Sequence, residues 1–179
     1  MTRRRAMALA GAMAVLGAPR VLRADVSSWL FIGSGPSWLQ RASQNPEYQP
    51  SLQMETGLGS SPRDLVVLGG LGRVHTHFGQ GTDLGLLIRS ATRGLVHGDW
   101  GAALDVGAYE RFWGVGSTGA LLSLSLGAPW GITLSLTGGI GTNDSKTISA
   151  VIGLDLARAT IYRQSGENWW ENPFPPEKR

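Results

Sequence analysis

Two histidines at alternate positions are the residues of this chain best placed to do chemistry. His75 and His77 lie two apart beside Arg73, so in an extended strand both imidazoles belong on one face. Paired imidazoles can bind a metal ion such as zinc. No third ligand lies nearby in the sequence, although Asp83 would join them if the register of the next strand allows it. The simpler interpretation places both histidines among the polar residues at the rim of a sheet, and we expect no metal and no cofactor.

A second candidate is a set of charged residues that all lie at odd-numbered positions within expected strands. These residues are Glu55, Arg73, Asp83, Arg89, Asp105, Arg111 and Asp155. Residues of one parity share one face of a strand, and in a narrow barrel that face is just accommodated inside. Charges enclosed there must be paired and hydrogen-bonded, since an isolated buried ion is prohibitively costly. The sequence therefore predicts a lumen plugged by a charge network, the alternative being a path that conducts or binds a ligand.

The elements that position these residues are β-strands, because apolar side chains recur at every second position, as in Leu84-Gly85-Leu86 and Leu122-Ser123-Leu124. The expected strands are roughly 28–39, 52–60, 65–78, 82–91, 100–112, 118–128, 131–140 and 147–162. Short turn-rich connections make neighbours in sequence pair antiparallel. We predict an all-β fold, an antiparallel up-and-down eight-stranded β-barrel, and expect no helix after residue 25. The glycine-rich segment from Gly69 to Gly72 lacks the lysine of a phosphate-binding loop and indicates close backbone packing.

The apolar, even-numbered face can fill a dry core, as in a soluble barrel, or meet lipid, as in a membrane barrel. Two observations favour lipid. The other face carries small polar residues, and the whole chain is only 16% charged, against ~25% in soluble domains. Aromatic residues at even positions also form two belts at the strand ends, as at the two interfaces of a bilayer. The belts are Trp38, Phe78 and Phe112 at one end, and Trp100, Trp130 and Tyr162 at the other. We therefore predict that Leu86, Leu104, Leu124 and Leu134 point away from the barrel axis.

With these features, residues 28–162 resemble the small eight-stranded outer-membrane β-barrel proteins of Gram-negative bacteria. The resemblance is one of architecture and includes no family-specific motif. Such barrels usually end at an aromatic residue, for which Tyr162 is the matching position, although 17 residues follow it. The resemblance implies a place in the outer membrane, contact with outer-membrane lipid, and insertion by the barrel-insertion machinery.

Some of these barrels are lipid-modifying hydrolases with a His and a Ser two apart on one strand. Here His75 is followed at that spacing by His77, and His97 by Asp99, so no such site is carried over. We therefore expect a non-catalytic protein with a structural or envelope-associated role. The alternatives are a soluble periplasmic or secreted barrel that binds a small apolar ligand, and an outer-membrane lipid-modifying hydrolase.

The two ends of the sequence differ from the rest. Residues 1–24 combine a basic start with an Ala- and Gly-rich stretch and predict a cleavable export signal. Five of the 16 Lys and Arg residues and none of the 13 acidic residues lie there, so the remaining chain has a net charge of −2 and no basic face for nucleic acid. There is no cysteine, so the barrel domain, residues 25–163, holds no disulfide. The Pro- and Trp-rich tail, residues 164–179, is a candidate for binding a periplasmic partner through the segment from Trp169 to Phe174, or for tucking into the barrel mouth.

Overall fold

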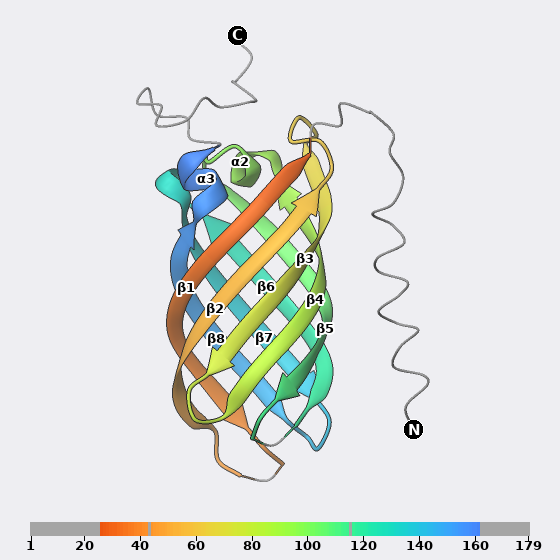
Figure 1. Cartoon of the computed structure of the whole chain (residues 1–179), viewed down its shortest axis with the longest axis vertical. Coiled ribbons are helices and arrows are strands. Elements are labelled where there is room, and N and C mark those ends of the chain that lie inside the picture. The colour runs from red at the N-terminus through yellow and green to blue at the C-terminus, as the bar shows by residue number, and fades with distance from the viewer. Residues whose placement is uncertain (1–25, 43, 115, 162–179) are drawn as a thin grey trace, which may run out of the picture.

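The computed structural model of the chain describes residues 26–42, 44–114 and 116–161, in which eight strands form a closed barrel (Figure 1). The strands are β1 (Ser27–Gln40), β2 (Glu47–Gly59), β3 (Val66–His77), β4 (Gly81–Thr92), β5 (Gly101–Phe112), β6 (Thr118–Gly127), β7 (Ile132–Gly141) and β8 (Lys146–Asp155). Each strand pairs antiparallel with the next, and β8 pairs with β1. The predicted eight-stranded up-and-down barrel is confirmed. The expected export signal and tail lie outside the described residues.

The two ends of the barrel are built differently (Figure 1). At one, the turn end, short connections join β1 to β2, β3 to β4, β5 to β6 and β7 to β8. At the other, the helical end, lie α2 (Arg93–Val96), the 3-10 turn η2 (Pro129–Gly131) and α3 (Leu156–Thr160). The expectation of no helix was therefore wrong at these connections. None of the helices in the described part of the chain is long and apolar enough to cross a membrane.

The last strand is shorter than the sequence pattern indicates. We expected it to continue to residue 162, but β8 ends at Asp155 and the chain turns directly into α3. The Asp155 carboxylate accepts a hydrogen bond from the backbone N–H of Arg158, which satisfies a free donor in the first turn of that helix. The cap explains why the alternation does not continue as a strand.

A single parity runs through all eight strands: odd-numbered side chains point inward and even-numbered ones outward. Leu86, Leu104 and Leu124 are 75%, 48% and 40% exposed, whereas Ser123 and Ser125 beside them are buried. Antiparallel pairing preserves the parity because outward residues pair with outward residues, as Leu104 does with Leu124. The predicted facing is confirmed, and the barrel has the polar interior and apolar exterior of the membrane type.

Several large apolar side chains also point inward at odd positions, among them Phe31 and Leu87, and the largest of them, Trp29, lies at the helical end. The indole of Trp29 lies over Gly59 and Gly69. A Cβ atom at Gly69 would meet the edge of that ring at 2.7 Å, so no side chain fits there. Within the glycine-rich segment of β3, close packing thus explains Gly69, whereas a Cβ atom at Gly70 or Gly72 would meet no atom closer than 3.9 Å.

Candidate functional site

The interior of the barrel carries all the charged residues that the sequence singled out. These are Glu55 and Arg73, Asp83 and Arg89, Asp105 and Arg111, and Asp155. Each is at most 4% exposed. The structure brings six of them into two ion-paired groups, and places the seventh, Asp155, at the cap of α3.

The first group, the central quartet, consists of Glu55, Arg73, Arg89 and Asp105. Arg89 joins both acids, with Nε 2.7 Å from Asp105 Oδ1 and Nη2 2.7 Å from Glu55 Oε2. Arg73 Nη2 completes the ring, 2.6 Å from Glu55 Oε1 and 3.2 Å from Asp105 Oδ2. Register explains the assembly, because Glu55 lies opposite Arg73 and Arg89 opposite Asp105 in adjacent strands. Two cations and two anions balance, so the quartet lies inside the barrel without net charge.

The second group, the Asp83 cluster, lies closer to the turn end. Arg111 donates two parallel hydrogen bonds to Asp83, from Nε to Oδ1 at 2.6 Å and from Nη2 to Oδ2 at 2.8 Å. This fork geometry is the strongest form of arginine–carboxylate contact. His77 Nε2 lies 3.1 Å from Asp83 Oδ2, and His77 Nδ1 lies 2.9 Å from the Ser37 hydroxyl.

The chain Ser37–His77–Asp83 has the order of a nucleophile, a base and an orienting acid. Its environment does not suit hydrolysis. Ser37 and His77 are 0% and 1% exposed, so no substrate carbonyl can approach the serine oxygen. The Ser37 hydroxyl also donates to the carbonyl oxygen of Gln49 at 3.0 Å, which competes with His77 for its single proton. The arrangement therefore serves to satisfy buried polar groups.

His75, the other candidate metal ligand, stacks on His77 with ring centroids 4.2 Å apart. It lies opposite Asp83 in the register of β3 and β4, as the sequence allowed. Its Nε2 is buried and has no hydrogen-bond partner. Among the described residues, however, no three His, Cys, Asp or Glu side chains are arranged to hold a metal ion. Both histidines lie inside the barrel, buried, rather than at an exposed rim.

Asp155, which the sequence assigned to the lumen network, acts at the helical end instead. Its Oδ1 accepts hydrogen bonds from the backbone N–H groups of Leu30, at 3.4 Å, and Arg158, at 3.2 Å. The Asp155 carboxylate thus links β1 to α3 by hydrogen bonds. The physical reason for the difference is the early end of β8, which makes this carboxylate a helix cap.

Arg158 of α3 is buried at the same end of the barrel. Its guanidinium donates to the carbonyl oxygens of Asp99 and Ala128, at 2.9 and 3.0 Å, and to the Thr133 hydroxyl, at 2.9 Å. Burial lowers the pKa of Arg158 below its ordinary value, and the nearby Asp155 carboxylate opposes that shift. This one side chain of α3 thereby contacts the connection before β5, the connection after β6, and β7 itself.

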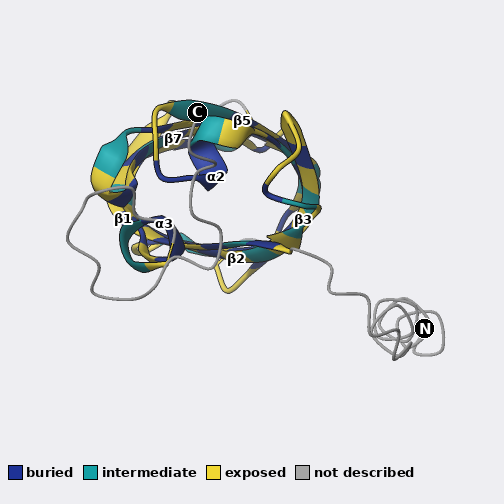
Figure 2. Ribbon diagram, turned by 90° about the horizontal axis from the view of Figure 1, so that it is seen from above, coloured by how far each residue is buried: buried dark blue, intermediate teal, exposed yellow. Residues whose placement is uncertain are grey.

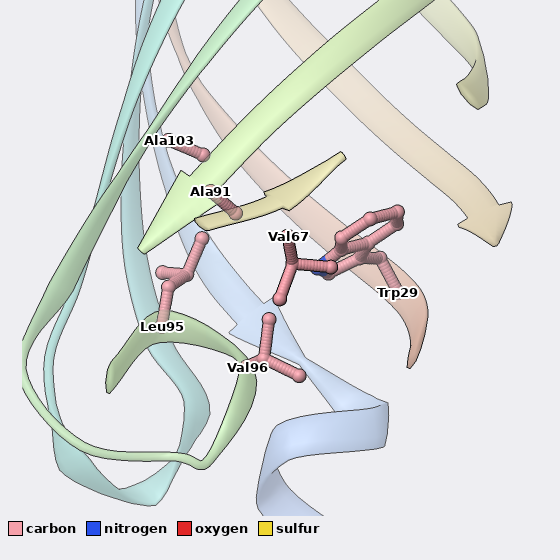
Figure 3. Close-up of a cluster of buried hydrophobic side chains, with 6 residues drawn as sticks. All are labelled: Trp29, Val67, Ala91, Leu95, Val96 and Ala103. Carbon is pink, nitrogen blue, oxygen red and sulfur yellow. The ribbon is translucent and has the colours of Figure 1, made fainter. Parts of the chain in front are cut away.

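A cluster of buried apolar side chains, the apolar plug, lies at the helical end (Figure 3). It consists of Trp29, Val67, Ala91, Leu95, Val96 and Ala103. Figure 2, which looks along the barrel from the helical end, shows α2 inside the ring of strands. Leu95 and Val96 of α2 are 2% and 1% exposed. Sequence reasoning missed this plug, although two adjacent apolar residues within a turn segment were a signal of it.

The outward face carries aromatic side chains at both ends. Trp38, Phe78 and Phe112 are exposed at the turn end, where Tyr48 packs edge-on against Trp38 with ring centroids 5.9 Å apart. Trp100 and Trp130 are exposed at the helical end, and Tyr162 lies outside the described residues.

Comparisons with known proteins add little to this description. No protein-family model matches the sequence, and no curated protein matches it. A similar solved structure is that of Ail, the attachment invasion locus protein of Yersinia pestis, in complex with the heparin analogue sucrose octasulfate. The two chains are 8% identical, the match covers 73% of this chain and 97% of that one, and the TM-score is 0.38. A likeness at this level says nothing about the ligand or the role of the present protein.

Proposed function

We propose that this protein is a non-catalytic barrel of the Gram-negative outer membrane with a closed lumen and a structural or envelope-associated role. The observation that carries the proposal is the division of the barrel wall. Its outer surface is apolar between two aromatic belts, while its ionised side chains are enclosed and paired. This is the distribution that a bilayer selects, because charge on the lipid face is costly.

The soluble alternative requires the opposite facing. A barrel that holds an apolar ligand in water would place Leu86, Leu104 and Leu124 around an internal cavity, whereas all three are exposed. A soluble monomer also rarely exposes an apolar patch of more than a few hundred Å². These outward leucines therefore favour lipid as the surrounding medium.

Fractionation tests the location directly. We expect the protein to sediment with the outer membrane, and to migrate faster on detergent gels before heating than after, since a closed barrel resists unfolding by detergent. The soluble fraction released by osmotic shock is assayed for the same protein as a comparison. Recovery of the protein there as a monomer would support the soluble alternative instead.

The closed lumen makes a separate prediction about conductance. The central quartet blocks the middle of the barrel, and the apolar plug with Arg158 closes the helical end. Purified protein reconstituted into planar bilayers should therefore give no stable single-channel currents. Reproducible conductance steps would contradict the closed lumen while leaving the membrane location intact.

The orientation follows from the same proposal. We infer that the helical end, where β1 begins and α3 follows β8, lies on the periplasmic side. The turn end then faces outward, with connections of only a few residues. Insertion by the barrel machinery and binding of a periplasmic partner through the tail remain parts of the proposal that this orientation accommodates.

A further inference from the structure

Within the described strands, the outward face of the barrel carries two charged residues of opposite sign. Glu110 and Lys146 are the charged residues at even-numbered positions of these strands, and both are exposed. Both also lie at the turn end, because Glu110 comes two residues before β5 ends at Phe112 and Lys146 is the first residue of β8. An anion and a cation therefore mark the two edges of the face that β5 to β8 form.

The barrel itself gives neither of these side chains a counter-charge. Their cross-strand neighbours are uncharged: Leu84 and Thr118 beside Glu110, Gln40 and Ile140 beside Lys146. Neighbouring strands lie about 4.8 Å apart, so roughly 14 Å separates the two edges of the face. Within the described part of the chain neither residue forms a salt bridge. Each is thus free to pair with a group outside its own barrel.

The surface between the two charges is apolar and hollowed. A hollow of about 470 Å³ extends across β5 to β8, with Lys146 at its edge. Gly138 leaves a gap in it, since a Cβ atom there would meet no other atom within 4 Å. The register partners of Gly138 are Leu122 and Ile148, whose side chains are 54% and 65% exposed. The face therefore offers both projecting apolar side chains and a gap that can receive one.

Symmetry makes this face complementary to itself. Two copies in one membrane share an orientation, so a two-fold axis that relates them runs along the membrane normal, and residues of one depth meet each other. An axis through the middle of the face exchanges its two edges. It brings Glu110 of each copy toward Lys146 of the other. Ala120 of β6 and Ile140 of β7, which pair in register, lie between the two charged strands and so closest to the axis.

We propose that the β5–β8 face is the interface of a symmetric homodimer, with two reciprocal Glu110–Lys146 ion pairs beside apolar contacts that fill the hollow. The inference rests on the proposed membrane location. A lipid molecule is the competing occupant of the hollow. An anionic head group beside Lys146 would leave the Glu110 carboxylate on the same face without a cation, whereas a second copy provides a partner for both signs.

Exchanging the charges tests the ion pairs, with association of the full chain measured by sedimentation equilibrium in density-matched detergent. The wild type should be a dimer. Glu110→Lys and Lys146→Glu should each lower the association constant about tenfold, because both ion pairs of the dimer become repulsions. An equimolar mixture of the two variants should regain the dimer, since a heterodimer again places opposite charges together at both contacts. A mixture that associates no better than either variant alone would overturn the proposal.

Cross-linking tests the same face in native membranes, because the chain contains no cysteine and a single introduced one reports its own contacts. A short bismaleimide should join Ala120→Cys into dimers. The matched control is Leu52→Cys, which is 37% exposed on β2, four strands away on the opposite side of the barrel, and should stay monomeric. Equal cross-linking at the two positions, or none at position 120, would contradict the interface and leave lipid as the occupant of the hollow.

Heat-modifiable mobility shows that each variant has folded. Failure of the wild type to sediment with the outer membrane would refute the location itself. It is distinct from a protein that enters the membrane and remains a monomer, which would refute the dimer alone.

Discussion

Replacing Arg89 by Met should lower the free energy of unfolding by about 3–5 kcal/mol, because it leaves the buried acids of the central quartet with one arginine between them. Met preserves the apolar part of the contact with the Trp29 ring, which lies 5.3 Å from the guanidinium carbon. The loss is then electrostatic rather than steric. Urea unfolding of protein reconstituted in vesicles, followed by linear extrapolation, measures the effect.

The control is a second substitution that removes one of the two acids, so that the quartet is again without net charge although Arg89 is still absent. In the double variant Arg89→Met with Asp105→Asn, the remaining pair Glu55 and Arg73, 2.6 Å apart, balances itself. We expect this variant to regain much of the stability lost by the single one, since a paired group costs far less than an orphaned charge. Additive losses from the two substitutions would show that the quartet does not act as one electrostatic unit.

The second large effect concerns the lipid face. Leu86→Arg should destabilise the barrel in a bilayer by about 2–4 kcal/mol, because it places a cation on the lipid face near the middle of β4. Leu86 is 75% exposed, so the arginine creates no clash inside the protein. The loss comes from contact of the guanidinium with hydrocarbon. The fraction of protein inserted into vesicles, with the urea midpoint of the inserted part, measures it.

Ser90→Arg is the matched control on the same outward face of β4, two residues before the strand ends at Thr92. Near the interface the same substitution costs about 0–1 kcal/mol, since the side chain reaches the head groups. Equal tolerance of arginine at positions 86 and 90 would contradict the assignment of this face to lipid. Because both variants add the same charge, the difference between them measures the effect of depth in the bilayer.

The alternation of side chains was sufficient to predict the fold and its facing, because one parity runs unbroken through the strands. Strand limits were less certain where prolines intervened. The segment before Leu52 looked like a turn because of Pro46 and Pro50, yet β2 begins at Glu47 and pairs Tyr48 with Trp38. Tertiary pairing there overrides a local signal for a turn.

Contacts across the barrel were beyond reach of the sequence. Parity places Asp83 and Arg111 on one face, but only register makes them opposite partners, and only closure of the barrel brings Arg73 of β3 to Thr137 of β7. The plug was missed for another reason. Leu95 lies in a connection, where the period of two does not apply, and its burial depends on how α2 enters the barrel.

The hydrogen bonds between β1 and β8 also constrain how this molecule can be made. The backbone N–H of Leu30 donates to a side chain 125 residues further along the chain. Until β8 has been synthesised, β1 and β7 present open edges, and such edges are templates for aggregation. We therefore expect the barrel to close only once its final strand is available, so that the chain stays unfolded until then.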